Sequence, residues 1–235
     1  MALARQGLLK LLGLRRSGIL NENYRTASAA HRKNIFVLRA NTLSNKPFRR
    51  LALLPALFFL AQGIHYWQIN QLGHMLWMCN IGNLLLAAGI FFEKPLLIRV
   101  AVIWSLPGAI VWCVYVVPTW GLVLTGRGNA ADVYAAIAST FAHVGGLSVA
   151  ILALKRVKMK NGTWLYALGW YFIIQAASRV FTSDELNVNL SHHLAYGWET
   201  RFGSYWTFWC LLALLTALVL WCLELALRLL WPLPE

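Results

Sequence analysis

Residues 96–117 read LLIRVAVIWSLPGAIVWCVYVV, an apolar stretch in which Arg99 is the only charged residue. A helix rises about 1.5 Å per residue, so this stretch is long enough to cross the roughly 30 Å hydrocarbon core of a bilayer. Similar apolar stretches occupy residues 51–68, 73–92, 132–154, 163–181 and 205–231. In lipid only helices or closed barrels satisfy every backbone group, so the sequence predicts an all-α, polytopic transmembrane helix bundle of about six spans.

The composition indicates that the chain is surrounded mostly by lipid. Hydrophobic residues make up 59% of the 235 and charged residues 12%, the mean hydropathy is +0.58, and there are 12 Trp. The net charge of +13 is that of many nucleic-acid-binding proteins, but 11 of the 21 Lys and Arg fall in the first 50 residues, which indicates topology instead. We expect membrane lipid as a partner and no nucleic acid.

The distribution of positive charge also predicts domains and orientation. Residues 1–50 form a basic N-terminal tail, which is either a retained cytoplasmic tail or a transit peptide, and residues 51–235 form the six-helix transmembrane domain. The tail, Lys94 and the basic segment 155–160 fall on one side if the spans alternate, which predicts both termini inside. A bacterial inner membrane is the expected location, with the mitochondrial inner membrane as the alternative.

No metal site is expected. The four cysteines lie in apolar segments without C-x-x-C spacing, so neither a disulfide framework nor a zinc site is indicated. The adjacent pair His192 and His193 lacks a ligand spacing such as H-x-x-x-H. No feature of the sequence points to a particular cofactor, which stays open.

The fourth apolar segment carries the clearest polar face. Asp132, Ser139 and His143 recur with small residues at three- and four-residue spacing and share one side of a helix. Small residues allow close helix packing, so the face is either a packing seam or part of a site. A histidine near mid-membrane is a site hypothesis, because it serves as base, ligand or hydrogen-bond relay.

Polar residues of other segments converge on the same depth. Asn83 lies about 15 Å from the start of the second segment and His143 about 16 Å from Asp132, while Cys79 lies about 6 Å shallower. We therefore predict a pocket that opens to the outer side, with Asn83 and His143 as its floor and residues 182–204 as its roof. The residues predicted to bind a ligand there are Asn80, Asn83, Asp132, Ser139, Gln175, Arg179, Asn187 and Asn189.

Short motifs suggest a family. Trp77-Met78-Cys79-Asn80-Ile81, then Phe141-Ala142-His143, then Asn187-Val188-Asn189 with Tyr196-Gly197, resemble in order the motifs of uncharacterised bacterial multi-pass inner-membrane proteins with a W-x-C-[DN]-I pattern and a mid-membrane His. More remotely, the chain is similar to transmembrane acyltransferases and lipid hydrolases that use a Cys or Thr nucleophile with His. Asn80 stands where an Asp is commoner in the pattern.

Three functions follow from these patterns. The first is an integral membrane protein whose polar intramembrane pocket binds a lipid or small molecule. The second is an intramembrane acyl-transfer or lipid-hydrolase enzyme, with catalytic residues Cys79 as nucleophile and His143 as base, and with amides that stabilise an oxyanion. The third is a non-catalytic accessory subunit that packs against partner membrane subunits through its Trp-rich surface.

Overall fold

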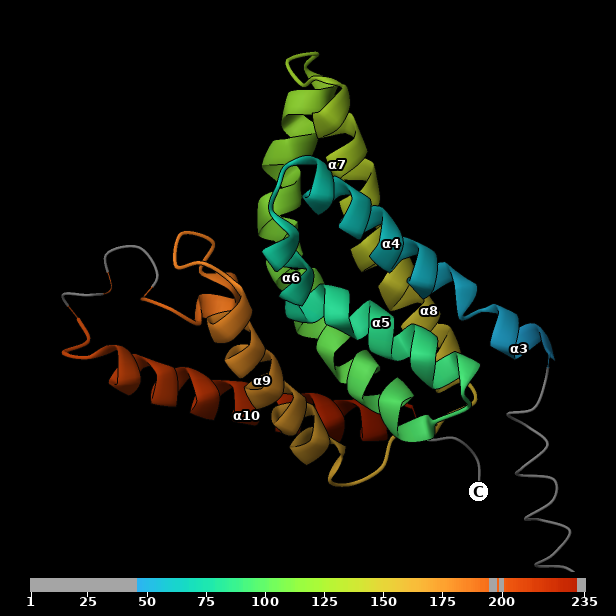
Figure 1. Ribbon diagram of the computed structural model, residues 1–235. Coiled ribbons are helices and arrows are strands. Elements are labelled where there is room, and N and C mark those ends of the chain that lie inside the picture. The colour runs from blue at the N-terminus through green and yellow to red at the C-terminus, as the bar shows by residue number, and fades with distance from the viewer. Residues whose placement is uncertain (1–45, 195–197, 199–200, 232–235) are drawn as a thin grey trace, which may run out of the picture. The chain divides into compact units, whose positions relative to one another are not determined.

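The computed structural model describes residues 46–194, 198 and 201–231, and this part of the chain is helical and contains no strand. The predicted tail before residue 46 and the Tyr196-Gly197 pair lie outside it. The main helices are α3 Lys46–Arg50, α4 Leu53–Gln68, α5 Met78–Phe91, α6 Pro95–Leu124, α7 Ala130–Thr140, α8 Gly146–Leu154, α9 Thr163–Phe181 and α10 Tyr205–Leu230. The predicted all-α helical bundle is confirmed (Figure 1).

Helices α5 and α6 form the centre of the packing. Leu86 and Ile90 of α5 and Ile98 and Ile103 of α6 are fully buried. A Cβ at Gly89 would lie 2.8 Å from the Ile98 backbone, so a glycine is required for this close approach. The two helices are joined by a short turn, which lets their apolar faces bury each other near the connection.

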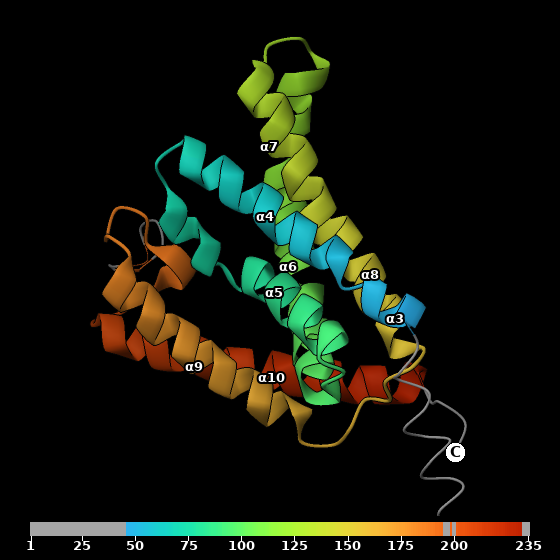
Figure 2. The ribbon, with the colours of Figure 1, turned by 45° about the vertical axis from the view of Figure 1, so that its right-hand side comes forward.

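Helix α7 continues through a π-helical turn, η2 Phe141–Gly145, into α8, and the three form one long segment antiparallel to α6 (Figure 2). Asn129 begins α7 with a capping box, in which its side chain accepts from the Asp132 N–H and the Asp132 carboxylate accepts from the Asn129 N–H. Helix α4 packs against both α5 and α7. These contacts place α4, α6 and α7 around a common space.

Helices α9 and α10 pack against each other (Figure 1), and Glu224 connects them. This buried carboxylate on α10 accepts hydrogen bonds from the N–H groups of Gly162, at 3.2 Å, and Trp164, at 2.9 Å, at the start of α9. Arg228 lies farther away, at 3.7 Å. Glu224 thus satisfies N–H groups that the first turn of a helix leaves without partners.

The helices differ in their ability to cross a membrane. In the described residues, Pro95–Leu124, Ala130–Leu154 and Tyr205–Leu230 are long and apolar enough to span a bilayer, which makes this an integral membrane protein. Helix α5 has 14 residues, because Trp77 adopts an extended conformation (ψ 136°) between the 3-10 helix η1 Leu72–Leu76 and α5. Helix α6 continues through Pro118 to Leu124, beyond residue 117, where the predicted apolar stretch ends.

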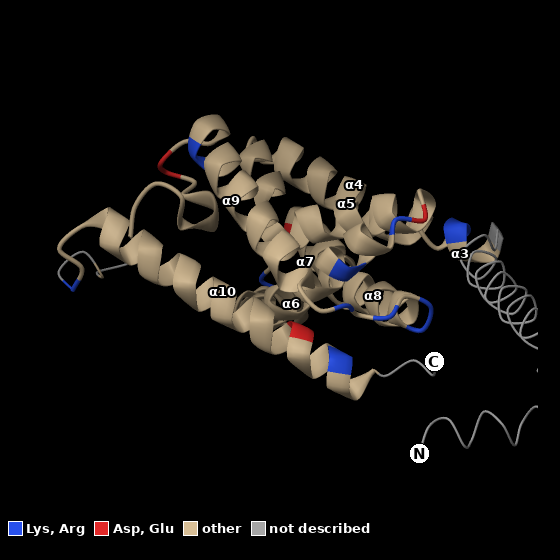
Figure 3. Cartoon of the chain, turned by 90° about the horizontal axis from the view of Figure 1, so that it is seen from below, with Lys and Arg blue, Asp and Glu red and all other residues tan. Residues whose placement is uncertain are grey.

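Most of the described Lys and Arg residues lie at one end of the helices, here called the basic end (Figure 3), whereas Arg127, Arg179 and Arg201 lie away from it. Arg49 pairs with Glu93 at 3.0 Å, and the Arg99 guanidinium donates to the Lys158 carbonyl at 2.7 Å. The ends of α3, α5 and α8 and the start of α6 therefore lie here, and Arg228 near the end of α10 bonds to Asn161 in the connection before α9. The opposite end, formed by η1, the loop 125–129 and residues 182–194, is called the η1 end.

Candidate functional site

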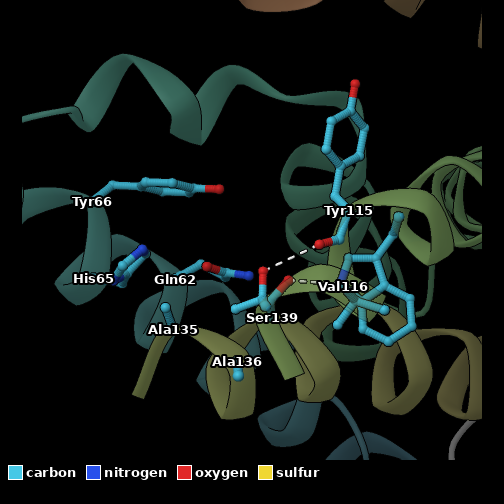
Figure 4. A pocket seen from close by; sticks show the side chains of 10 residues that line it. Gln62, His65, Tyr66, Tyr115, Val116, Ala135, Ala136 and Ser139 are labelled. Carbon is cyan, nitrogen blue, oxygen red and sulfur yellow. Dashed lines mark hydrogen bonds between the residues drawn. The ribbon is translucent and has the colours of Figure 1, made fainter. Parts of the chain in front are cut away.

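A cavity of about 180 Å³ lies between α4, α6 and α7 (Figure 4). Its lining comes from the last turns of α4, the second half of α6 and α7, so it lies nearer the η1 end than the basic end. Its lining combines aromatic rings with amide and hydroxyl groups. The lining residues are Gln62, His65, Tyr66, Trp112, Tyr115, Val116, Thr119, Ala135, Ala136 and Ser139. It contains no Lys, Arg, Asp or Glu, so the cavity is polar without carrying a formal charge of fixed sign.

Gln62 is the most unusual residue of this cavity. Its side chain is 2% exposed, yet its amide makes no hydrogen bond to another described residue, and Figure 4 shows the amide directed into the space that His65, Tyr66 and Ser139 also border. Nearly all buried polar side chains in proteins have a partner. The Gln62 amide atoms are not enclosed by protein and border the open space of the cavity, so they are placed to bond with something that enters it.

Ser139, a predicted site residue, lines the cavity and is held by two aromatic side chains. The Trp112 indole N–H donates to the Ser139 hydroxyl oxygen at 2.7 Å. The His143 ring stacks on Trp112, with centroids 5.1 Å apart and an angle of 10° between the planes. His143 does not line the cavity itself and contacts it through Trp112, which stands in the cavity wall.

The backbone at His143 is unusual too. Residues 141–145 form the π-helical turn, and the Nδ1 atom of His143 lies 2.9 Å from the Ser139 carbonyl oxygen. Single π turns inside α-helices occur frequently at functional sites, because they change the direction of one side chain. Here the turn separates the cavity-lining residues of α7 from the packing face of α8.

Asn80 and Asn83 bond between elements and do not line the cavity. The Asn83 amide donates to the Ala142 carbonyl at 2.9 Å and to the Cys79 carbonyl at 3.1 Å. The Asn80 amide donates to the His74 carbonyl at 3.0 Å. Asn83 therefore meets α7–α8 at the depth of residue 142, next to His143, and holds α5 against that segment.

Cys79 lies against α6. A Cβ at Gly108 would be 3.2 Å from the Cys79 Cβ, so the glycine makes room for it. Tyr66, which points its hydroxyl into the cavity in Figure 4, also lies beside the Asn80 side chain and near the thiol. Among the described residues no hydrogen bond joins Cys79 to His143, whose ring bonds instead to the Ser139 carbonyl.

The remaining predicted residues form a separate polar cluster at the η1 end. The Gln175 amide donates to the Asn189 carbonyl at 2.8 Å, and the Asn189 amide donates to the Leu76 carbonyl at 2.8 Å. Asn187 accepts from the backbone N–H groups of the two residues that follow Ser191. These contacts fasten the loop after α9 to α9 and η1, and none of these residues lines the cavity.

Arg179 belongs to this cluster. Its guanidinium donates to the Ser191 carbonyl and lies over the rings of Tyr205 and Trp206, at 5.1 and 5.2 Å from their centroids. Asp132, the last predicted residue, caps α7. The structure thus distributes the predicted residues among a cavity wall, helix contacts and a loop anchor, and does not gather them into one pocket.

Sequence reasoning missed the α4 wall of the cavity. Gln62, His65 and Tyr66 lie three and four residues apart on a segment that is otherwise strongly apolar, which is the periodicity of a polar helix face. That spacing was the available signal. Trp112 and Tyr115 on α6 gave no such sequence signal, because aromatic residues are as common on lipid-facing surfaces as in binding sites.

Comparison of the chain with protein-family models, with curated proteins and with solved structures found no match.

Proposed function

We propose that this integral membrane protein binds a lipid head group or a small molecule in the cavity between α4, α6 and α7. The observation that carries the proposal is Gln62, which is 2% exposed and directs an amide without a hydrogen-bond partner among the described residues into that cavity. A ligand that accepts from or donates to this amide gains a hydrogen bond worth about 0.5–1.5 kcal/mol. The geometry of the lining therefore favours an occupied cavity.

The orientation proposed from the sequence receives support from the basic end. Arg156 lies over the Phe48 ring at 4.9 Å, and Arg228 donates to Asn161 at 3.2 Å, so the basic residues of several connections and helix ends gather together. Under the positive-inside rule this end faces the cytoplasm or matrix, and the cavity opens toward the outer side. We propose a bacterial inner membrane, with a mitochondrial inner membrane as the alternative.

Binding is favoured over acyl transfer by the surroundings of the two predicted catalytic groups. A nucleophilic thiol has to lie within hydrogen-bond reach of its base. Cys79 packs against Gly108, whereas the His143 ring bonds to the Ser139 carbonyl and stacks on Trp112. Cys79 and His143 are thus each held by other contacts and do not form a nucleophile–base pair, an arrangement that suits a binding protein.

The experiment that tests the proposal compares two variants with the same chemical change. Gln62→Leu removes the buried amide, and Gln68→Leu removes an exposed amide from the end of the same helix. Each protein is purified from membranes in mild detergent and extracted with organic solvent, and the extract is analysed by mass spectrometry against the bulk membrane extract.

We expect a compound that is enriched with the wild type and with Gln68→Leu, and depleted about tenfold with Gln62→Leu, since one lost hydrogen bond of about 1.4 kcal/mol corresponds to that factor. Identical extracts from all three proteins contradict the proposal. An enriched protein in place of a small molecule supports the accessory-subunit alternative.

A further inference from the structure

The size of the cavity limits what it can hold. An engineered cavity of about 150 Å³ in another protein binds benzene. The cavity between α4, α6 and α7 measures about 180 Å³, so it accommodates a single six-membered ring with small substituents. A diacyl phospholipid head group with its glycerol backbone is much larger than this.

The lining also determines the charge of the ligand. None of the ten residues that line the cavity is Lys, Arg, Asp or Glu. A charge inside a membrane-embedded cavity without a counter-charge is very costly. A phosphate, carboxylate or ammonium group is therefore a poor fit, and a neutral ligand is a good one.

Hydrogen-bonding groups line the space on two neighbouring walls, α4 and α7. On the α4 wall, the Gln62 amide and the Tyr66 hydroxyl point into the cavity, and Ser139 borders it from the neighbouring α7 wall (Figure 4). The Ser139 oxygen accepts from Trp112, which leaves its own O–H to donate. Donors on two separate walls match a ring that carries more than one acceptor.

Aromatic side chains line part of the cavity, and one of them, Tyr115, is exposed. Trp112 and Tyr115 contribute flat apolar surface, which packs well against a planar ring. Tyr115 is 69% exposed although it lines the cavity, so the cavity borders the outer surface of α6 there. An apolar tail attached to the ring can leave the cavity on this side and enter the lipid.

We infer that the ligand is a 1,4-benzoquinone-type head group of a membrane quinone, with its two carbonyl oxygens bonded to the Gln62 or Tyr66 side and to the Ser139 side. This inference rests on the proposed function, because it names the ligand class of the same cavity. It concerns binding of the oxidised ring only.

The test titrates decylubiquinone into the full-length protein in phosphatidylcholine nanodiscs. Quinones quench tryptophan fluorescence, and Trp112 lies in the cavity wall, so binding appears as a saturable component above the linear quenching in the bilayer. Replacing Trp112 with Phe identifies that component. Decylbenzene, which has the ring and tail without the oxygens, serves as the competing ligand.

We expect saturable quenching with the wild type and with Gln68→Leu, and a midpoint about tenfold higher with Gln62→Leu, for one lost hydrogen bond. Ser139→Ala, a smaller change that is safer for folding, should raise the midpoint severalfold. A tenfold excess of decylbenzene should leave the quinone bound. Displacement by decylbenzene, or equal midpoints for wild type, Gln62→Leu and Ser139→Ala, overturns the quinone assignment.

The two proposals can fail separately. If Gln62-dependent extraction yields a compound without a quinone ring and decylubiquinone shows no saturable quenching, the quinone inference is wrong and the cavity still binds a ligand. If no compound depends on Gln62 and decylubiquinone does not saturate, both are wrong.

Discussion

Replacing Glu224 should separate α9 from α10. Glu224 is 2% exposed, and its carboxylate accepts from two backbone N–H groups at the start of α9. Hydrogen bonds to charged groups contribute about 1.5–3 kcal/mol each, and part of that gain offsets the desolvation of the carboxylate. We therefore expect Glu224→Leu to lower the free energy of unfolding by about 3 kcal/mol, and Glu224→Gln, which keeps one acceptor oxygen, by about half as much.

The assay is unfolding in mixed micelles of mild detergent and SDS, followed by tryptophan fluorescence. Arg228→Gln is the matched control, because Arg228 lies 3.7 Å from the same carboxylate and its side chain is 40% exposed, so its loss should cost less than about 1 kcal/mol. At 3 kcal/mol the unfolding equilibrium of Glu224→Leu shifts more than a hundredfold. Equal stabilities for Glu224→Leu and Arg228→Gln would refute the reasoning.

Further predictions concern the site and the topology. Gly146→Ala should lower the free energy of unfolding by about 1–3 kcal/mol in the same assay, because the new Cβ would overlap the Asn83 amide. Gly169→Ala is the control and should be neutral or slightly stabilising, because its Cβ meets no atom within 4 Å. His143→Leu should weaken ligand binding two- to tenfold in the quenching titration, because stacking of His143 on Trp112 contributes about 0.5–1.5 kcal/mol. Unchanged binding would show that His143 does not position Trp112 for the ligand. With the native cysteines replaced, a cysteine at Lys158 should react with an impermeant thiol reagent only from the inside and one at Asn129 only from the outside, and the reverse pattern would invert the topology.

The helices were predictable because lipid requires long apolar runs. The predicted segments 163–181 and 205–231 agree with α9 Thr163–Phe181 and α10 Tyr205–Leu230 to within a residue. Segment 73–92 was predicted too long, because Trp77 leaves the helical conformation and its indole N–H bonds to the His74 ring. Helix α6 was predicted too short, since proline ends soluble helices more often than membrane-embedded ones.

The site was predictable only where one helix contains the signal. The periodic face of α7 placed Ser139 on the inside of the bundle, and Ser139 lines the cavity. Depth arithmetic brought Asn83 to the level of His143, and the Asn83 amide bonds to the carbonyl of the preceding residue, Ala142. Periodicity cannot say which helices pair, so it could not show that α4 contributes Gln62 to the cavity while the loop after α9 anchors to η1.

An experimental structure in lipid nanodiscs, with the protein purified directly from its native membrane, tests the central claim most directly. The account predicts density in the cavity between Gln62 and Ser139, within hydrogen-bond distance of the Gln62 amide and too large for isolated waters. An empty cavity, or a Gln62 side chain that bonds to a neighbouring residue and closes the space, would contradict it.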